Sequence, residues 1–213
     1  MFYRSTIGKK IIVALTGLVL FGFVGGHLLG NLQVFAGPQK INEYAEFLEH
    51  SPALLWGTRI LLLISVAFHV ICTIQLTARN KESRPISYAH TQVIAANLPS
   101  RFMMWSGIFL GAYIIFHLLH LTGGYFHPHF QAEDVYSNLI QGFSVWSVSL
   151  FYIAAMVALG FHLFHGLWSV FQTLGLNHEK YNCYRRVFAV VVSIAISLGY
   201  ISIPVAILLG ILH

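Results

Sequence analysis

The sequence predicts an all-α membrane protein in which five transmembrane helices form a single domain over residues 1–213. The first observation is composition: 57% of the residues are hydrophobic and 9% are charged, a balance more apolar than that of ordinary soluble domains. The second is length, because a bilayer core of about 30 Å is crossed by about 20 apolar residues, and five such runs follow one another. The connecting loops are too short for a further domain.

Each apolar run is expected to form a helix, because a helix satisfies its own backbone hydrogen bonds in lipid. The first run is longer than the apolar region of a signal peptide, so we expect it to remain as a helix. Tryptophans lie in or near the ends of the runs, where indole rings favour the membrane interface. The runs cover Ile11–Phe35, Ala53–Ala78, Phe102–Leu121, Phe143–Leu174 and Val187–Leu212.

The basic residues predict the orientation of this integral, multi-pass protein. Only Lys40 and Arg59 fall on one side of a five-helix arrangement, and the other basic residues fall on the opposite side. The basic side is expected to be cytoplasmic, because cytoplasmic loops are normally rich in lysine and arginine. We therefore expect a cytoplasmic N-terminus and an external C-terminus, and no nucleic-acid partner is needed to explain the net charge of +5. The opposite side carries Arg4, Lys9, Lys10, Arg79, Lys81, Arg84, Arg101, Lys180, Arg185 and Arg186.

Histidines are the ionisable residues that recur inside the runs. Ionisable side chains within a membrane are costly and usually mark function. A single buried histidine is more often a packing residue, but four successive runs each carry at least one. They are His27 in the first run, His69 in the second, His117 and His120 in the third, and His162 and His165 in the fourth.

The depth of these histidines predicts one shared level near the outer side. His27 follows Lys10 by 17 residues, about 26 Å along a helix, and His117 follows Arg101 by 16 residues, about 24 Å. Both runs cross the membrane in the same direction. His27 and His117 are therefore expected to lie at one height.

A second level lies deeper. His69 precedes Arg79 by 10 residues, about 15 Å, and His162 precedes Leu174 by 12 residues, about 18 Å. His165 is about 14 Å from the same end, so depth alone permits either His162 or His165 as the partner of His69. Two pairs of imidazoles at two heights are the ligand set of two bis-histidine haems.

Other metals suit this pattern less well. Structural zinc gathers four ligands at one height, and di-iron bundles need several glutamates. Transport of copper, nickel or protons along a histidine-lined path remains an alternative. Glycines crowd the first run, and they permit either close helix contact or room for a flat macrocycle.

Four stretches, FVGGHLLGNLQVF, AFHVI, GIFLGAYIIFH and FHLFHGLWSV, resemble the five-helix dihaem cytochrome b of succinate dehydrogenases and fumarate reductases that use a single large membrane anchor. The resemblance covers nearly the whole chain. It implies five transmembrane helices of which the first four form a haem-binding bundle, two b-type haems, a quinone site, and two soluble partners, a flavoprotein and an iron–sulfur protein. It further implies an outer haem between His27 and His117 and an inner haem between His69 and His162.

The resemblance also bears on three other residues. Glu49, in FLEHSP, matches an acidic residue at the family's quinone site and is expected to exchange protons there, although an ordinary solvated loop carboxylate is the alternative. His120 and His165 depart from the family pattern. The resemblance therefore favours His162 over His165 as the iron ligand.

Together these features predict the membrane anchor and electron-transfer subunit of a succinate:quinone oxidoreductase in a bacterial cytoplasmic membrane. Electrons would pass from the iron–sulfur subunit through both haems to a quinone, with menaquinone expected rather than ubiquinone, or in reverse during fumarate reduction. The alternatives are another dihaem b-type cytochrome that uses quinone or ascorbate, and a histidine-lined metal or proton transporter.

Overall fold

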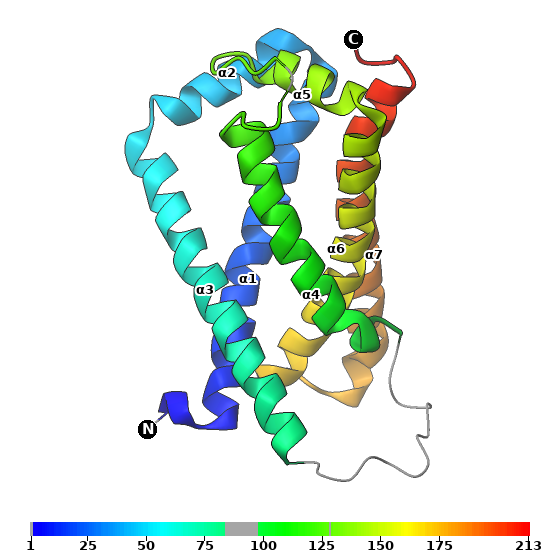
Figure 1. Ribbon diagram of the computed structural model, residues 1–213. Coiled ribbons are helices and arrows are strands. Elements are labelled where there is room, and N and C mark those ends of the chain that lie inside the picture. The colour runs from blue at the N-terminus through cyan, green and yellow to red at the C-terminus, as the bar shows by residue number, and fades with distance from the viewer. Residues whose placement is uncertain (1, 84–97, 128) are drawn as a thin grey trace.

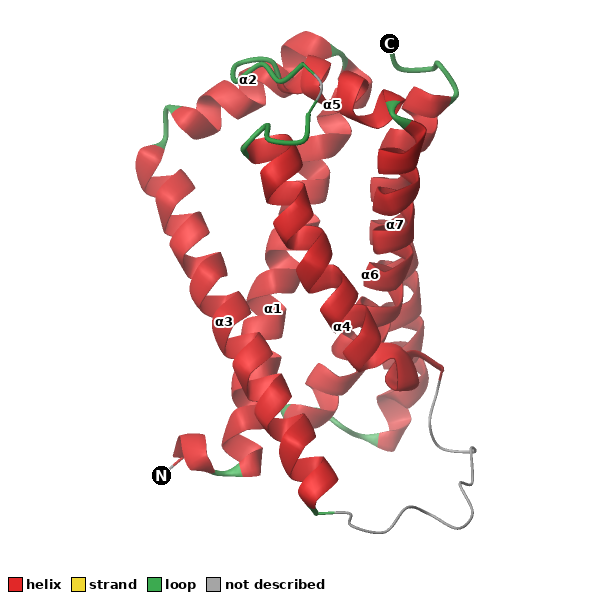
Figure 2. Cartoon of the chain, in the orientation of Figure 1, coloured by secondary structure: helices red, strands yellow, loops and turns green. Residues whose placement is uncertain are grey.

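The computed structural model describes residues 2–83, 98–127 and 129–213, and within them it is all-helical with no strand (Figure 2). Five helices are long and apolar enough to cross a membrane, which confirms the predicted multi-pass architecture. They are α1 (Thr6–Asn31), α3 (Pro52–Glu82), α4 (Leu98–His117), α6 (Trp146–Thr173) and α7 (Asn182–Leu208).

Two further helices close one end of the bundle, which we call the C-terminal end because the C-terminus lies there and the N-terminus lies at the other (Figure 1). They are α2 (Pro38–Glu49) and α5 (Val135–Ser144). The sequence predicts short loops at both positions, and the structure forms helices there instead. The signals for them are a proline in the first turn of α2 and Asp134, whose carboxylate caps the start of α5.

Short helical turns complete the described chain. The 3₁₀ turns are η1 (Phe2–Arg4), η2 (Leu32–Ala36) and η5 (Glu179–Tyr181). The π-helical turn η4 (Leu118–Thr122) continues α4 and carries His120. A π turn rotates the residues after it relative to a regular helix, so His120 does not keep the facing that regular α-helical spacing from His117 would give it.

The transmembrane helices associate as two hairpins. α1 packs along α3, α4 packs along α6, and α7 packs on α6, while α1 joins the halves through α6 and α7 (Figure 1). Within the described residues, neither α1 with α4 nor α3 with α6 is among the closely packed pairs. The backbones of α1 and α4, and those of α3 and α6, are therefore farther apart than those of helices in ordinary contact. Side chains that meet between them extend across this wider separation.

Burial follows this arrangement. One buried cluster lies under α2 and α5 and includes Val34, Leu139, Phe143, Tyr152 and Ile203. By contrast α3 exposes most of its apolar side chains, for example Leu63 with 73% of its surface accessible. An exposed apolar helix surface of this kind fits contact with lipid.

The basic side chains gather at the N-terminal end, in the first turns of α1 and α7 and the last turns of α3. Arg185 is buried there and donates to the Leu176 carbonyl (3.1 Å) and to the side chains of Asn177 (2.6 Å) and Asn182. Arg84 and the side chain of Arg101 lie outside the described part of the structure.

Candidate functional site

Two pairs of histidine rings bridge the two hairpins. His27 of α1 and His117 of α4 have ring centroids 6.0 Å apart. His69 of α3 and His162 of α6 have ring centroids 6.4 Å apart. Depth along the sequence predicted the first pair, while for His69 it left His162 and His165 open and the resemblance favoured His162. Each pair joins two helices whose backbones are not closely packed.

The His69–His162 pair is held by two short hydroxyl side chains. Ser106 donates its proton to the Met103 carbonyl (3.1 Å), so its oxygen is left to accept from Nδ1 of His162 (3.3 Å). Thr16 likewise donates to the Ile12 carbonyl (2.7 Å) and accepts from Nδ1 of His69 (3.2 Å). Because a neutral imidazole carries one proton, both rings then have a free lone pair on Nε2.

A glycine follows each of these hydroxyl residues. A β-carbon at Gly17 would lie 3.4 Å from Cε1 of His69, and one at Gly107 would lie 3.6 Å from Cε1 of His162. Both distances are ordinary van der Waals contacts, so each ring lies close to the backbone of the helix that carries its hydroxyl partner.

The hydroxyl–glycine pair is a signal that sequence reasoning missed. Thr16-Gly17 precedes His27 by 11 residues, counted from the threonine, and Ser106-Gly107 precedes His117 by 11 residues, counted from the serine. The first helix of each hairpin therefore has two roles. It carries the hydroxyl that supports one histidine of the deeper pair, and it also carries one histidine of the other pair. Matching this spacing along the chain would have identified both supporting residues.

The His27–His117 pair has an aromatic setting instead. Phe23 stacks on His27 with centroids 5.2 Å apart, and Tyr113 stacks on His117 at 5.7 Å. The Tyr152 hydroxyl of α6 lies 3.4 Å from Nδ1 of His117. No hydrogen bond joins the His27 ring to another described residue, so its orientation depends on packing.

The two extra histidines occupy different surroundings. His120 is completely buried, stacks on Phe116 at 5.4 Å, and places its Nδ1 3.1 Å from the Tyr152 hydroxyl. His165 is half-buried and has no ring or hydrogen-bond contact with the described residues. Of the two neighbours on α6, His162 is therefore the one that faces His69.

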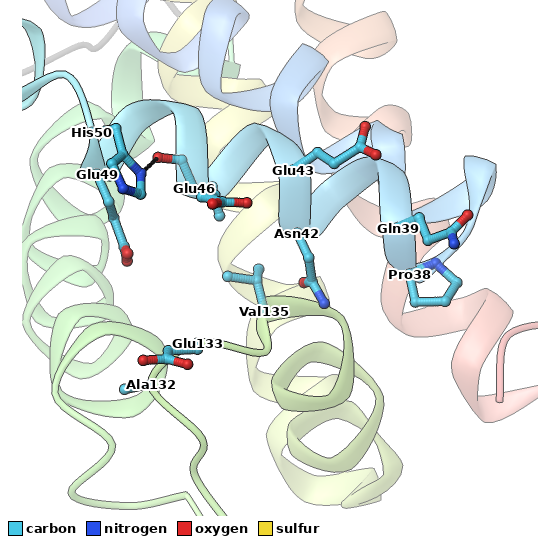
Figure 3. A pocket seen from close by; sticks show the side chains of 11 residues that line it. Pro38, Gln39, Asn42, Glu43, Glu46, Glu49, His50, Ala132, Glu133 and Val135 are labelled. Carbon is cyan, nitrogen blue, oxygen red and sulfur yellow. Dashed lines mark hydrogen bonds between the residues drawn. The ribbon is translucent and has the colours of Figure 1, made fainter.

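Glu49 lies away from the transmembrane histidines, at the end of α2. It lines a pocket of about 610 Å³ between α2 and the segment that leads into α5. Glu46 and Glu133 line the same pocket, and the residues shown in Figure 3 approach it from those two segments. The His50 ring at its edge donates from Nδ1 to the Glu46 carbonyl (3.0 Å). The pocket is thus acidic and open to the C-terminal end of the bundle.

Whether the histidine pairs suit a haem is tested by their separation. For each imidazole ligand, the metal–nitrogen bond is about 2.0 Å long and the ring centre lies about 1.1 Å beyond the nitrogen. Two ligands on opposite sides of a metal therefore have ring centres about 6.2 Å apart. The observed 6.0 Å and 6.4 Å lie on either side of this value. Among the described residues, no group of three or more histidine, cysteine or carboxylate side chains is arranged to hold a metal ion. The two ring separations are compatible with two sites of two histidine ligands each.

Comparisons with known proteins do not assign the chain to a family. No family model, curated protein or solved structure matches it.

Proposed function

We propose that this protein is the membrane anchor and electron-transfer subunit of a succinate:quinone oxidoreductase, with two bis-histidine b-type haems. The observation that carries the proposal is the pair of ring separations, 6.0 Å for His27–His117 and 6.4 Å for His69–His162, at two levels of one bundle. Gly17 of α1 lies beside His69 and so marks the deeper level on that helix. Because Gly17 precedes His27 by ten residues, the two levels are about 15 Å apart along α1.

In this proposal each histidine pair holds one haem through Nε2 nitrogens. A b-type haem so bound supplies reversible one-electron transfer at its iron. Thr16 and Ser106 keep the protons of His69 and His162 on Nδ1, which orients both rings and leaves the ligating nitrogen unprotonated.

The open spaces along two helices support the same assignment. At Gly22, Gly25 and Gly26 of α1, and at Gly111 of α4, no heavy atom lies within 4 Å of where a β-carbon would stand. These positions lie between the two histidine levels of each helix. Glycine at such positions leaves room for a planar macrocycle beside the helix.

The two ends of the bundle have separate roles in the proposal. The basic N-terminal end faces the cytoplasm and docks the iron–sulfur subunit, which receives electrons from the flavoprotein. The C-terminal end serves the quinone, for which we propose menaquinone. Glu49 is the proposed proton-exchange residue, because its carboxylate opens on an acidic pocket through which protons reach water.

The test of the subunit assignment is purification of the tagged full chain from its native membranes in mild detergent. We expect a flavin-containing and an iron–sulfur subunit to copurify, and we expect added succinate to reduce the haem absorption bands. A preparation that contains haem but no soluble partner, and does not respond to succinate, would identify a different dihaem cytochrome. A preparation without haem would favour the transporter alternative.

A further inference from the structure

His120 is buried more completely than any of the four proposed iron ligands, and packing alone does not explain it. Its exposed fraction is 0%, and its Nε2 has no hydrogen-bond partner among the described residues. Leaving a buried nitrogen unpaired is unfavourable for stability. Gly142 of α5 allows the ring to fit, since a β-carbon there would lie 2.9 Å from Cε1 of His120.

A chain of two hydrogen bonds connects His120 to the His27–His117 pair. The Tyr152 hydroxyl lies 3.4 Å from Nδ1 of His117 and 3.1 Å from Nδ1 of His120. Tyr152 is itself fixed by packing, because Phe143 of α5 meets its ring edge to face at 4.8 Å. The phenol is thus held between two imidazoles that come from one helix and its π-helical extension.

The direction of these hydrogen bonds follows from iron ligation. If Nε2 of His117 binds iron, its proton is on Nδ1 and is donated to the Tyr152 oxygen. Tyr152 then donates its own proton to Nδ1 of His120, whose remaining proton lies on the unpaired Nε2. The opposite direction would put the proton of His117 on Nε2, where it blocks ligation.

We infer that Tyr152 and His120 form a hydrogen-bond relay that fixes the ligating form of His117 and lowers the reduction potential of the proposed outer haem. The inference rests on the proposed haem ligation. Drawing the Nδ1 proton toward an acceptor makes an imidazole a stronger electron donor, which favours ferric iron. His120 acts through Tyr152, because an oxygen that donates to one partner becomes a better acceptor for another.

The two residues are positioning residues, and no covalent bond is made or broken in the relay. The contrast with the His69–His162 pair is internal to the molecule. There the acceptors are aliphatic hydroxyls whose protons go to carbonyls of their own helices. Changes at Tyr152 or His120 should therefore act on one haem and leave the other as a reference.

The test is a spectroscopic redox titration of the purified complex with Tyr152→Phe, His120→Leu and the double variant. We expect Tyr152→Phe to raise the potential of one haem component and leave the other unchanged. His120→Leu should produce a smaller rise of the same component. In the double variant His120→Leu should add nothing to the effect of Tyr152→Phe, because its influence passes through the phenol.

Tyr113→Phe is the matched control. It removes a phenolic hydroxyl beside the same histidine, but Tyr113 makes no hydrogen bond to the described residues. Its ring stacks on His117 and also contacts the rings of Phe151 and Tyr152, and phenylalanine keeps these ring contacts. Its potentials should equal those of the wild type. His120→Gln, which retains a hydrogen-bond acceptor, should bring the potential that His120→Leu raises back toward the wild-type value.

Three outcomes would overturn the relay. The first is that Tyr152→Phe shifts the haem potential no more than Tyr113→Phe does. The second is that His120→Leu shifts the potential equally in the wild type and in the Tyr152→Phe variant. If the Tyr152→Phe variant does not bind the outer haem, its potential cannot be measured, and His120→Leu is compared with His120→Gln instead. The third outcome that would overturn the relay is an equal haem potential in those two variants. Absence of haem from the wild type is a different result, because it refutes the proposed function itself.

Discussion

The two histidine pairs differ in how their rings are held. Around His69 and His162, each support is a small hydroxyl residue followed by glycine on the neighbouring helix. Around His27 and His117, the supports are large aromatic side chains, and one hydrogen bond reaches His117 through Tyr152. The deeper pair is thus oriented by single hydrogen bonds to the neighbouring helices, and the other pair mainly by aromatic packing beneath α2 and α5.

This difference predicts different sensitivities. Each hydroxyl support of the deeper pair is a single side chain on the neighbouring helix, so the effect of its loss should be confined to one site. Supports made by packing depend on α5 and on the turn that carries His120, so damage at the C-terminal end should reach the His27–His117 pair and spare the other.

The largest expected effect is loss of one haem when a ligand is removed. His69→Ala or His162→Ala should reduce two haems per chain to one, because a single imidazole does not complete bis-histidine ligation. His117→Ala should remove the other haem. The measurement is pyridine haemochrome content per purified chain.

His165→Asn is the control for His162→Ala. His165 does not face His69, so this variant should retain both haems. Loss of haem in His165→Asn with retention in His162→Ala would exchange the roles of the two neighbours.

A smaller effect is expected at the supporting hydroxyls of the deeper pair. Thr16→Val and Ser106→Ala remove acceptors for the Nδ1 protons of His69 and His162, and loss of such partners typically weakens metal affinity by about 10- to 100-fold. Haem transfer from the complex to apomyoglobin measures the change. If both haems are lost at wild-type rates, the hydroxyls have no role in orientation.

Gly142→Ala tests the packed pair. Its β-carbon would lie 2.9 Å from His120 and 3.1 Å from His127, so overpacking should cost about 1–3 kcal/mol. Thermal unfolding in detergent measures this cost, and the haem spectrum should change for one site alone. Gly166→Ala is a control, because no heavy atom lies within 4 Å of its β-carbon position; equal stability of the two variants would contradict the packing described here.

The smallest effect concerns the cap of α5. Hydrogen bonds from Ser137 and from Asn42 hold the pKa of the Asp134 carboxyl below its usual value. Because the pKa is lowered in the folded state, the ionised carboxylate stabilises the fold at pH values above the ordinary pKa of a carboxyl group. This contribution is lost as the pH falls through the lowered pKa. Asp134→Ala should cost about 1 kcal/mol at neutral pH.

The pH dependence supplies the control for Asp134→Ala. Its unfolding temperature should lie below that of the wild type at pH 7, and the difference should shrink at pH values below the ordinary carboxyl range. A difference that is independent of pH would mean that the charge of Asp134 does not stabilise the cap.

The sequence was sufficient for the five membrane helices because twenty-residue apolar runs have one stable form in lipid. It also placed His27 level with His117, since helix rise converts residue number into depth. Depth did not separate His162 from His165 as the partner of His69, because the two residues lie only one helical turn apart. It did not reveal α2 and α5, whose short amphipathic sequences gain stability from packing on Tyr152 and its neighbours. It could not orient His120 either, because the π turn changes the facing that regular helical spacing predicts.

The central claim is that two histidine pairs each hold one haem. The most direct measurement is the reduced-minus-oxidised absorption spectrum of the purified wild-type protein, combined with haem content per chain. We predict b-type bands from two low-spin haems per polypeptide. A protein of intact helical content that shows no b-type bands after expression with sufficient haem would contradict the claim.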